Sequence, residues 1–241
     1  VTNINKIPPV ITVDDYIKIP TNQDITVTLR ADKGEFQPIK GLVFNSDGSV
    51  SYTFTEDDTV TFTVIDAWGN ITKETIEITN IYREPPIISA TRLVEEWTNE
   101  NYDIKVDFSK KTIGADLEKL ILPNGNIIQI TTESSYNYEI SKNGDYKFII
   151  GDVAGNSSET TINVSNIDML PPLATLTVDN ENFTNQNVII TVDAEDEIAN
   201  EEFASSGIKQ IKNSNIDNVN MVTKTEVVAS DIAEFEVAEN G

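Results

Sequence analysis

The stretch Asp152-Val153-Ala154-Gly155-Asn156 carries the strongest indication of how this chain folds. It lies between two β-rich runs, Tyr146–Ile150 and Thr160–Val164. The glycine supplies a positive φ, and the Asp and Asn side chains can hydrogen-bond the backbone of a turn. A Gly-Asn pair between two such runs therefore predicts a β-hairpin.

A related stretch, Asp66-Ala67-Trp68-Gly69-Asn70, occurs earlier in the chain. It lies between the runs Val60–Ile65 and Thr75–Ile78, and so predicts a second hairpin of the same kind. The two stretches differ most at their third residue, where a tryptophan takes the place of an alanine.

Two further landmarks recur together and indicate an internal repeat. A Pro-Pro pair is followed by a Thr-Asn pair at the same spacing, from 8 to 21, from 85 to 98 and from 171 to 184. Two successive prolines restrict φ and favour extended chain, so we expect short, semi-rigid linkers at these pairs. The linker prolines are Pro8, Pro9, Pro85, Pro86, Pro171 and Pro172.

An apolar, mostly alternating run follows each Thr-Asn pair and predicts a strand. The three runs are Asp24–Leu29, Tyr102–Phe108 and Val188–Asp193. No stretch shows a convincing helical period, although Ala115–Leu120 is compatible with either a helical turn or a strand. The whole pattern predicts an all-β chain.

The repeat suggests how the chain is divided. An asparagine stands five residues before the first proline of each pair, at Asn3, Asn80 and Asn166. We therefore interpret residues 1–7 as the last strand of a preceding module, 8–84 as module 1, 85–170 as module 2, and 171–241 as module 3 without its closing hairpin. An open sheet edge is expected in module 3.

The composition excludes several kinds of chemistry. The 241 residues include 17 Lys and Arg against 40 Asp and Glu, a net charge of −23. Such a surface repels phosphate backbones and anionic lipid, so we expect no nucleic-acid partner and no direct membrane insertion. The chain has no His and no Cys, which excludes a Ser-His-Asp triad, thiol catalysis, disulfides and the usual zinc sites.

Besides the turn at 152–156, the chain carries Asp193-Ala194-Glu195-Asp196 followed by Ser206-Gly207-Ile208-Lys209-Gln210-Ile211. With these two patterns it resembles the bacterial immunoglobulin-like repeats found in tandem in surface proteins, adhesins and secreted multimodular enzymes of Gram-positive bacteria. The resemblance covers essentially the whole chain. It departs from the family pattern at Trp68, where the family has a small residue, and the Ser-Gly-Ile element is clear only in module 3. It implies tandem immunoglobulin-like β-sandwich modules in an elongated array.

The resemblance further implies a structural or adhesive role at the cell surface or in the cell wall of a Gram-positive bacterium. We expect a stalk that spaces or presents a distal domain, with neighbouring modules and a host protein or glycan as partners. The alternative is an accessory carbohydrate-binding or spacer region of a secreted glycan-active enzyme. We expect no enzymatic activity and no required cofactor.

The predicted turns allow two interpretations. Either their side chains only cap the hairpins, or some of them bind calcium, which takes six to eight oxygen ligands. One Asp and one Asn do not complete such a shell, so capping is the favoured interpretation. The turn residues are Asp66, Gly69, Asn70, Asp152, Gly155 and Asn156; the calcium candidates are Asp152, Asn156, Asp193 and Asp196.

The two tryptophans of the chain are Trp68 and Trp97. We expect Trp97 to pack at the end of its module, because it directly precedes a Thr-Asn pair. Trp68 stands in a turn, where an exposed aromatic ring can stack on a sugar or anchor a protein partner. The alternative for Trp68 is packing against a neighbouring module.

Overall fold

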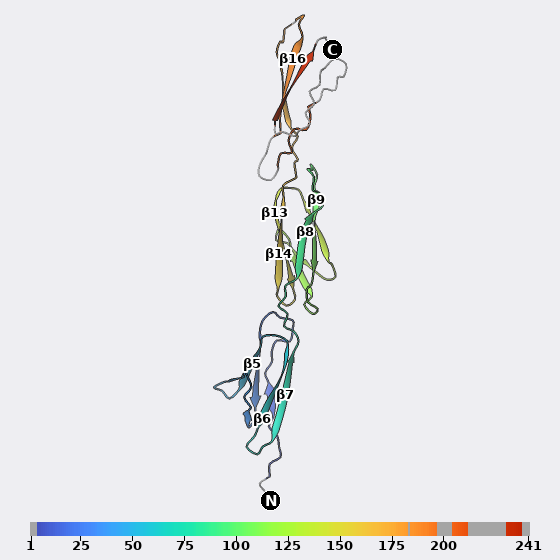
Figure 1. Cartoon of the computed structure of the whole chain (residues 1–241). Helices are drawn as coiled ribbons and strands as arrows, with labels where there is room; N and C mark the ends of the chain where they lie inside the picture. The colour runs from blue at the N-terminus through green and yellow to red at the C-terminus, as the bar shows by residue number, and fades with distance from the viewer. Residues whose placement is uncertain (1–3, 183, 197–203, 212–229, 238–241) are drawn as a thin grey trace. The chain divides into compact units, whose positions relative to one another are not determined.

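All the regular structure of the chain is β-strand in the ranges that the computed structural model describes, which are residues 4–182, 184–196, 204–211 and 230–237. The strands pair into several antiparallel sheets (Figure 1). No helix occurs among these residues, and hence none that could cross a membrane. The prediction of an all-β chain is therefore confirmed for the described residues.

The chain forms two compact units, which we describe separately. The first contains Val1–Ile88, Phe108–Ser134 and Phe148–Glu159, and the second contains Ser89–Asp107, Ser135–Lys147 and Thr160–Gly241. This division does not follow the module boundaries expected from the repeat, which stay a prediction.

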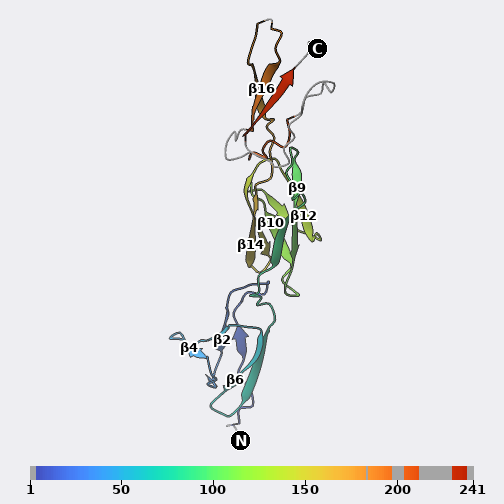
Figure 2. The ribbon, with the colours of Figure 1, turned by 45° about the horizontal axis from the view of Figure 1, so that its top comes forward.

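Two sheets of the first unit share one hydrophobic core. One has the strand order β1 (Ile11–Val13), β2 (Ile25–Ala31), β5 (Val50–Phe54), β4 (Val43–Phe44). The other has the order β3 (Glu35–Phe36), β6 (Asp58–Ile65), β7 (Ile71–Ile78). Figure 2 shows β2 and β6 from the two sheets.

Alternation along each strand explains this core. In β2 the side chains of Ile25, Val27 and Leu29 are buried, while the residues between them are not. Phe54 of β5 and Phe62 of β6 are also fully buried in the same cluster. Because successive side chains point to opposite faces of a strand, each sheet presents one apolar face to the shared core.

Two further sheets are built from residues 87–164. One has the order β11 (Ile127–Gln129), β10 (Leu117–Ile121), β13 (Gly144–Asp152), β14 (Ser157–Val164), so the ambiguous run at 115–120 is mainly a strand. The other has the order β12 (Ser135–Ile140), β9 (Tyr102–Ser109), β8 (Ile87–Arg92). Both predicted hairpins are present, as β6–β7 and β13–β14.

The last described sheet has the order β15 (Leu173–Val178), β16 (Val188–Glu195), β17 (Ser230–Val237). The outer edge of β17 pairs with no other strand in the described ranges, and the open edge expected in module 3 stays a prediction. Asn3 and the end of the chain at 238–241, which entered the predicted boundaries, lie outside the described residues.

The Pro-Pro pairs directly precede strands. β8 begins right after Pro86, β15 begins right after Pro172, and β1 begins two residues after Pro9. Proline lacks an N–H and fixes φ, so it suits an extended segment that enters a sheet. Pro9 and Pro86 are buried, whereas Pro172 is exposed.

The core assignment of the first unit can be tested with Phe62→Ala. The ring is fully buried and its centroid lies 5.8 Å from that of Tyr52. We expect the free energy of unfolding of this unit to fall by about 3–5 kcal/mol, because the change removes buried apolar surface and leaves a cavity. Urea denaturation followed by circular dichroism measures it.

The matched control is Thr61→Ala, on the opposite face of the same strand. Thr61 is exposed, and its hydroxyl hydrogen-bonds only that of Thr75 across the sheet at 2.9 Å. We expect a loss below about 1 kcal/mol. Equal losses in the two variants would contradict a core shared by the two sheets.

Candidate functional site: turns that contact the linkers

The first Asp turn, residues 66–70, is held by its own aspartate. Asp66 is buried, and its Oδ1 accepts hydrogen bonds from the backbone N–H groups of Trp68 at 3.0 Å and Asn70 at 2.9 Å. The Asn70 side chain donates to Asp66 Oδ2 at 2.9 Å. Gly69 has φ of 84°, a conformation that glycine adopts without strain.

The second Asp turn, residues 152–156, repeats these contacts. Asp152 Oδ1 accepts from the backbone N–H groups of Ala154 at 3.0 Å and Asn156 at 2.8 Å, and Oδ2 accepts from the Asn156 side chain at 2.9 Å. Gly155 has φ of 92°. Both aspartates are therefore engaged as caps within their turns, and calcium binding at Asp152 and Asn156 stays a prediction.

The charge of Asp66 is stabilised by its turn. Burial acts to raise the pKa of this carboxyl, but hydrogen bonds from Asn70 and Trp68 and the nearby ammonium of Lys33 outweigh it and lower the pKa below its ordinary value. A carboxylate that accepts several N–H groups favours its ionised form. The turn is therefore stabilised by the charged state of its aspartate.

The asparagine of each turn also contacts a linker. Asn70 Nδ2 lies 3.3 Å from the carbonyl oxygens of both Asn5 and Ile7. Asn156 Nδ2 donates to the carbonyl of Tyr82 at 2.9 Å. One amide group thus closes the turn and also satisfies a carbonyl of the chain that precedes a Pro-Pro pair.

Further contacts hold the linker around Tyr82 in the first unit. The backbone N–H of Tyr82 donates to the carbonyl of Thr21 at 2.8 Å. Gly114, with φ of 101°, lies so close to Tyr82 that an added Cβ would come within 2.3 Å of the phenol oxygen. Glu84 pairs with Lys111 at 3.7 Å. The Tyr82 side chain therefore restricts the size of the side chain that position 114 can hold.

Arg83 adds a second set of bonds to this linker. Its guanidinium donates to the carbonyl of Asn22 at 2.9 Å, to the carbonyl of Thr55 at 2.9 Å and to the carboxylate of Asp24. Arginine presents five donors in a planar fork, so one side chain can satisfy several acceptors. The sequence analysis did not find Arg83; its position two residues before a Pro-Pro pair was the available signal.

A second asparagine closes the loop that precedes each of the first two Thr-Asn pairs. Asn80 Nδ2 donates to the carbonyls of Ile17 at 3.3 Å and Ile19 at 2.6 Å. Asn166 Nδ2 likewise donates to the carbonyls of Val94 at 3.1 Å and Glu96 at 2.7 Å. Asn80 and Asn166, two of the asparagines that marked the repeat in the sequence, therefore share one structural role.

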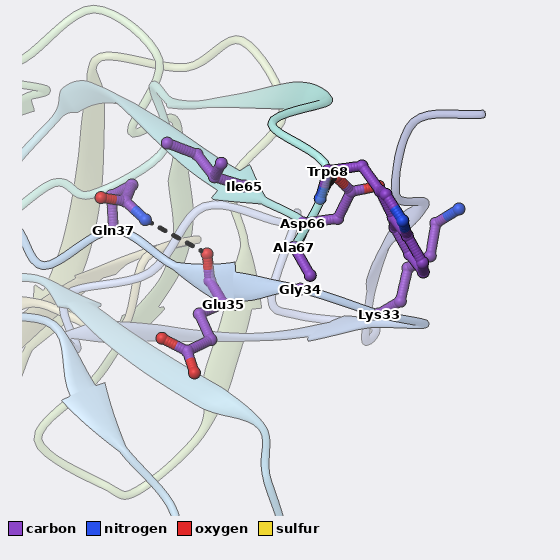
Figure 3. A pocket seen from close by; sticks show the side chains of 8 residues that line it. All are labelled: Lys33, Gly34, Glu35, Gln37, Ile65, Asp66, Ala67 and Trp68. Carbon is purple, nitrogen blue, oxygen red and sulfur yellow. Dashed lines mark hydrogen bonds between the residues drawn. The ribbon is translucent and has the colours of Figure 1, made fainter. Parts of the chain in front are cut away.

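Trp68 borders an open hollow in the first unit. The hollow has a volume of about 640 Å³, and Trp68 is 60% exposed. Figure 3 shows the side chains of Glu35 and Gln37 on one side of Gly34 and those of Trp68 and Lys33 on the other. The hollow therefore combines an aromatic face with charged and amide groups.

The third residue of the two Asp turns differs in exposure. Ala154 holds the same place in the second Asp turn and is only 6% exposed, with Asn22 beside it. Trp97 is 49% exposed, more than we expected for a packed residue, and it borders a separate hollow in the second unit with Asp168 and Ser206.

The remaining calcium candidates lie in the second unit. Asp193 is an exposed residue of β16, and Asp196, which follows the strand, is buried. The two differ in surroundings, because only Asp196 is held by a nearby loop, through Ser205 and Gly207.

Comparisons with known proteins assign no family. No protein-family profile matches the chain, and no curated protein matches it. One solved structure, from a study of the host-cell-surface retention of a 1.5-MDa bacterial ice-binding adhesin, aligns over 97% of this chain and 88% of its own, at 13% identity and a TM-score of 0.36. This similarity is too weak to assign a fold or a function.

The lowered pKa of Asp66 predicts a specific acid dependence for Asp66→Asn. Ionised Asp66 stabilises the fold above about pH 4, the ordinary pKa of aspartate, and this contribution is lost as the pH falls through the lower folded-state pKa. We expect Tm to be lower for the variant at pH 7, and the gap to wild type to close towards pH 2.

Thermal unfolding from pH 7 to pH 2 measures this gap. Glu77→Gln is the control, because Glu77 is an exposed residue of β7, the strand that follows this turn. A gap for Asp66→Asn that stays constant over the whole range would show that charge is not how the aspartate acts.

Proposed function

We propose that the chain is a spacer built from immunoglobulin-like modules of a bacterial cell-surface protein, which presents a distal domain and does not catalyse a reaction. The all-β architecture, the shared core of two antiparallel sheets in the first unit and the recurrent Pro-Pro, Thr-Asn and Asp-turn landmarks support the immunoglobulin-like assignment. Modules that contact only their neighbours suit such a spacer.

The observation that carries this proposal is the double use of the turn asparagines. Asn70 and Asn156 each bond their own aspartate and also a linker carbonyl. A spacer must resist bending where its linkers are short, and a linker bonded to a closed hairpin turn has fewer conformations than a free one. These hydrogen bonds therefore lie at the linkers, where a spacer has to resist bending.

Asn156→Ala tests this function through the exposure of the linker to protease. The variant loses the bond to the carbonyl of Tyr82, which is worth about 0.5–1.5 kcal/mol, and weakens the turn itself. We expect trypsin to cleave after Arg83 about tenfold faster under native conditions, because local opening becomes more frequent. Mass spectrometry of the fragments identifies the cut.

The matched control is Asn163→Ala. Asn163 is an exposed asparagine of β14 whose amide donates to Asp145 at 2.8 Å. It should leave cleavage after Arg83 unchanged. If Asn156→Ala also leaves that rate unchanged, the turn does not restrain the linker and the spacer function loses its main support.

The Trp68 hollow favours a second function, binding of a glycan. An exposed indole beside Lys33, in a hollow that Glu35 and Gln37 also line, offers a stacking face together with hydrogen-bonding groups, which is the combination that sugars need. This function would suit an adhesin, and equally an accessory region of a secreted glycan-active enzyme.

A glycan array probes this second function. We expect a hit for the wild-type chain that Trp68→Ala abolishes and that Trp97→Ala, which removes the other exposed indole, retains. A hit that survives Trp68→Ala, or the absence of any hit, would leave the hollow without a role in glycan recognition.

A further inference from the structure

Two buried carboxylates approach one short piece of backbone in the second unit. Asp168 and Asp196 are 7% and 5% exposed. The N–H of Ser206 donates to Asp168 Oδ2 at 2.8 Å, and the N–H of the next residue, Gly207, donates to Asp196 Oδ2 at 2.5 Å. Because the two donors are consecutive, one short piece of backbone links the two buried carboxylates.

The charge of Asp196 is only partly satisfied. Its Oδ2 also accepts the hydroxyl of Ser205 at 2.9 Å, but its buried Oδ1 has no hydrogen-bond partner in the part of the chain that the structure describes. Within that part, neither Asp196 nor Asp168 forms an ion pair with a lysine or arginine. A buried carboxylate in this state is unfavourable unless a cation compensates it.

The other two repeats carry their own cation at the corresponding place. The position twelve residues after the Thr of each Thr-Asn pair is Lys33, Lys110 and Asp196 in turn. Lys33 Nζ donates to the carbonyl of Ile7 at 2.8 Å, and Lys110 Nζ pairs with Asp116 at 2.7 Å. In the third repeat an acidic residue replaces the lysine, so positive charge must come from elsewhere.

The equivalence of these positions does not rest on spacing alone. In each repeat the threonine hydroxyl accepts the backbone N–H two residues later, from Gln23 at 3.1 Å, Glu100 at 3.0 Å and Gln186 at 3.0 Å. Strands β2, β9 and β16 then begin four residues after the threonine each time. The replacement of lysine by aspartate therefore occurs at one structural position.

We propose that a divalent cation of the calcium type binds between Asp168 and Asp196. Calcium accepts irregular shells of six to eight oxygens and takes backbone carbonyls and water beside carboxylates. No three acidic side chains converge in the described ranges, so two carboxylates would be the charged ligands. Asp168 and Ser206 also line the hollow of about 650 Å³ beside Trp97, which gives the ion a route from solvent.

This site differs from the calcium candidates of the sequence analysis. It pairs Asp196 with Asp168, which that analysis did not find, and it leaves out the exposed Asp193. With two charged ligands we expect a dissociation constant of about 10⁻⁴ to 10⁻³ M, the range of extracellular calcium modules. The inference is independent of the spacer function, because it concerns charge compensation inside the second unit.

Calcium titration of the full 241-residue chain tests the proposal. CaCl2 is titrated calorimetrically into chelator-treated protein at constant ionic strength. We expect one saturable site, weakened at least tenfold by Asp196→Asn and by Asp168→Asn. Asp193→Asn, which removes an exposed charge from the same strand end, should change the affinity less than twofold.

Thermal unfolding can also be measured for variants that no longer bind calcium. In EDTA, Asp196→Asn should raise Tm above that of wild type, because it removes the uncompensated charge. Calcium should raise Tm of wild type and leave that of the variant unchanged. An unchanged wild-type Tm, an equal effect of MgCl2, or a lower Tm of the variant in EDTA would overturn the proposal.

Discussion

The hydrogen bond from Asn156 Nδ2 to the carbonyl of Tyr82, 2.9 Å long, joins a closed hairpin turn to a linker. Asn156 can make it only because Asp152 already holds the same amide group through its other hydrogen, at 2.9 Å. An amide has two donors, and both are used. The aspartate thus orients the asparagine, and the asparagine restrains the linker.

This arrangement explains why the turn needs its particular residues. A buried carboxylate must be matched by donors, and the turn supplies two backbone N–H groups and one side-chain amide to Asp66 and the same set to Asp152. Glycine at the fourth position lets the backbone take a positive φ in both turns. The linker contacts depend on this closed geometry, and so indirectly on the glycine.

Positions that share a backbone role carry different side chains, and the surroundings of those side chains differ accordingly. Ala154 is buried beside Asn22, whereas Trp68 in the corresponding place is exposed beside a hollow. Tyr82 packs on Gly114, whereas Asp168, which also lies two residues after a strand-end asparagine, accepts a hydrogen bond from Ser206. The exposed side chains at turns and linkers therefore differ between positions whose backbone role is the same.

The sequence by itself predicted the strands that follow the Thr-Asn pairs and the two Asp-turn hairpins, because alternation and turn chemistry are local properties. It left open whether Trp68 is exposed or packed against a neighbouring module. Only the tertiary structure placed Asn156 on Tyr82, 74 positions away, and Asp168 and Asp196 on the consecutive N–H groups of Ser206 and Gly207, since such distant residues meet only after distant strands have paired. Burial and hydrogen-bond satisfaction depend on those long-range contacts, so no local pattern could show that one oxygen of Asp196 lacks a partner.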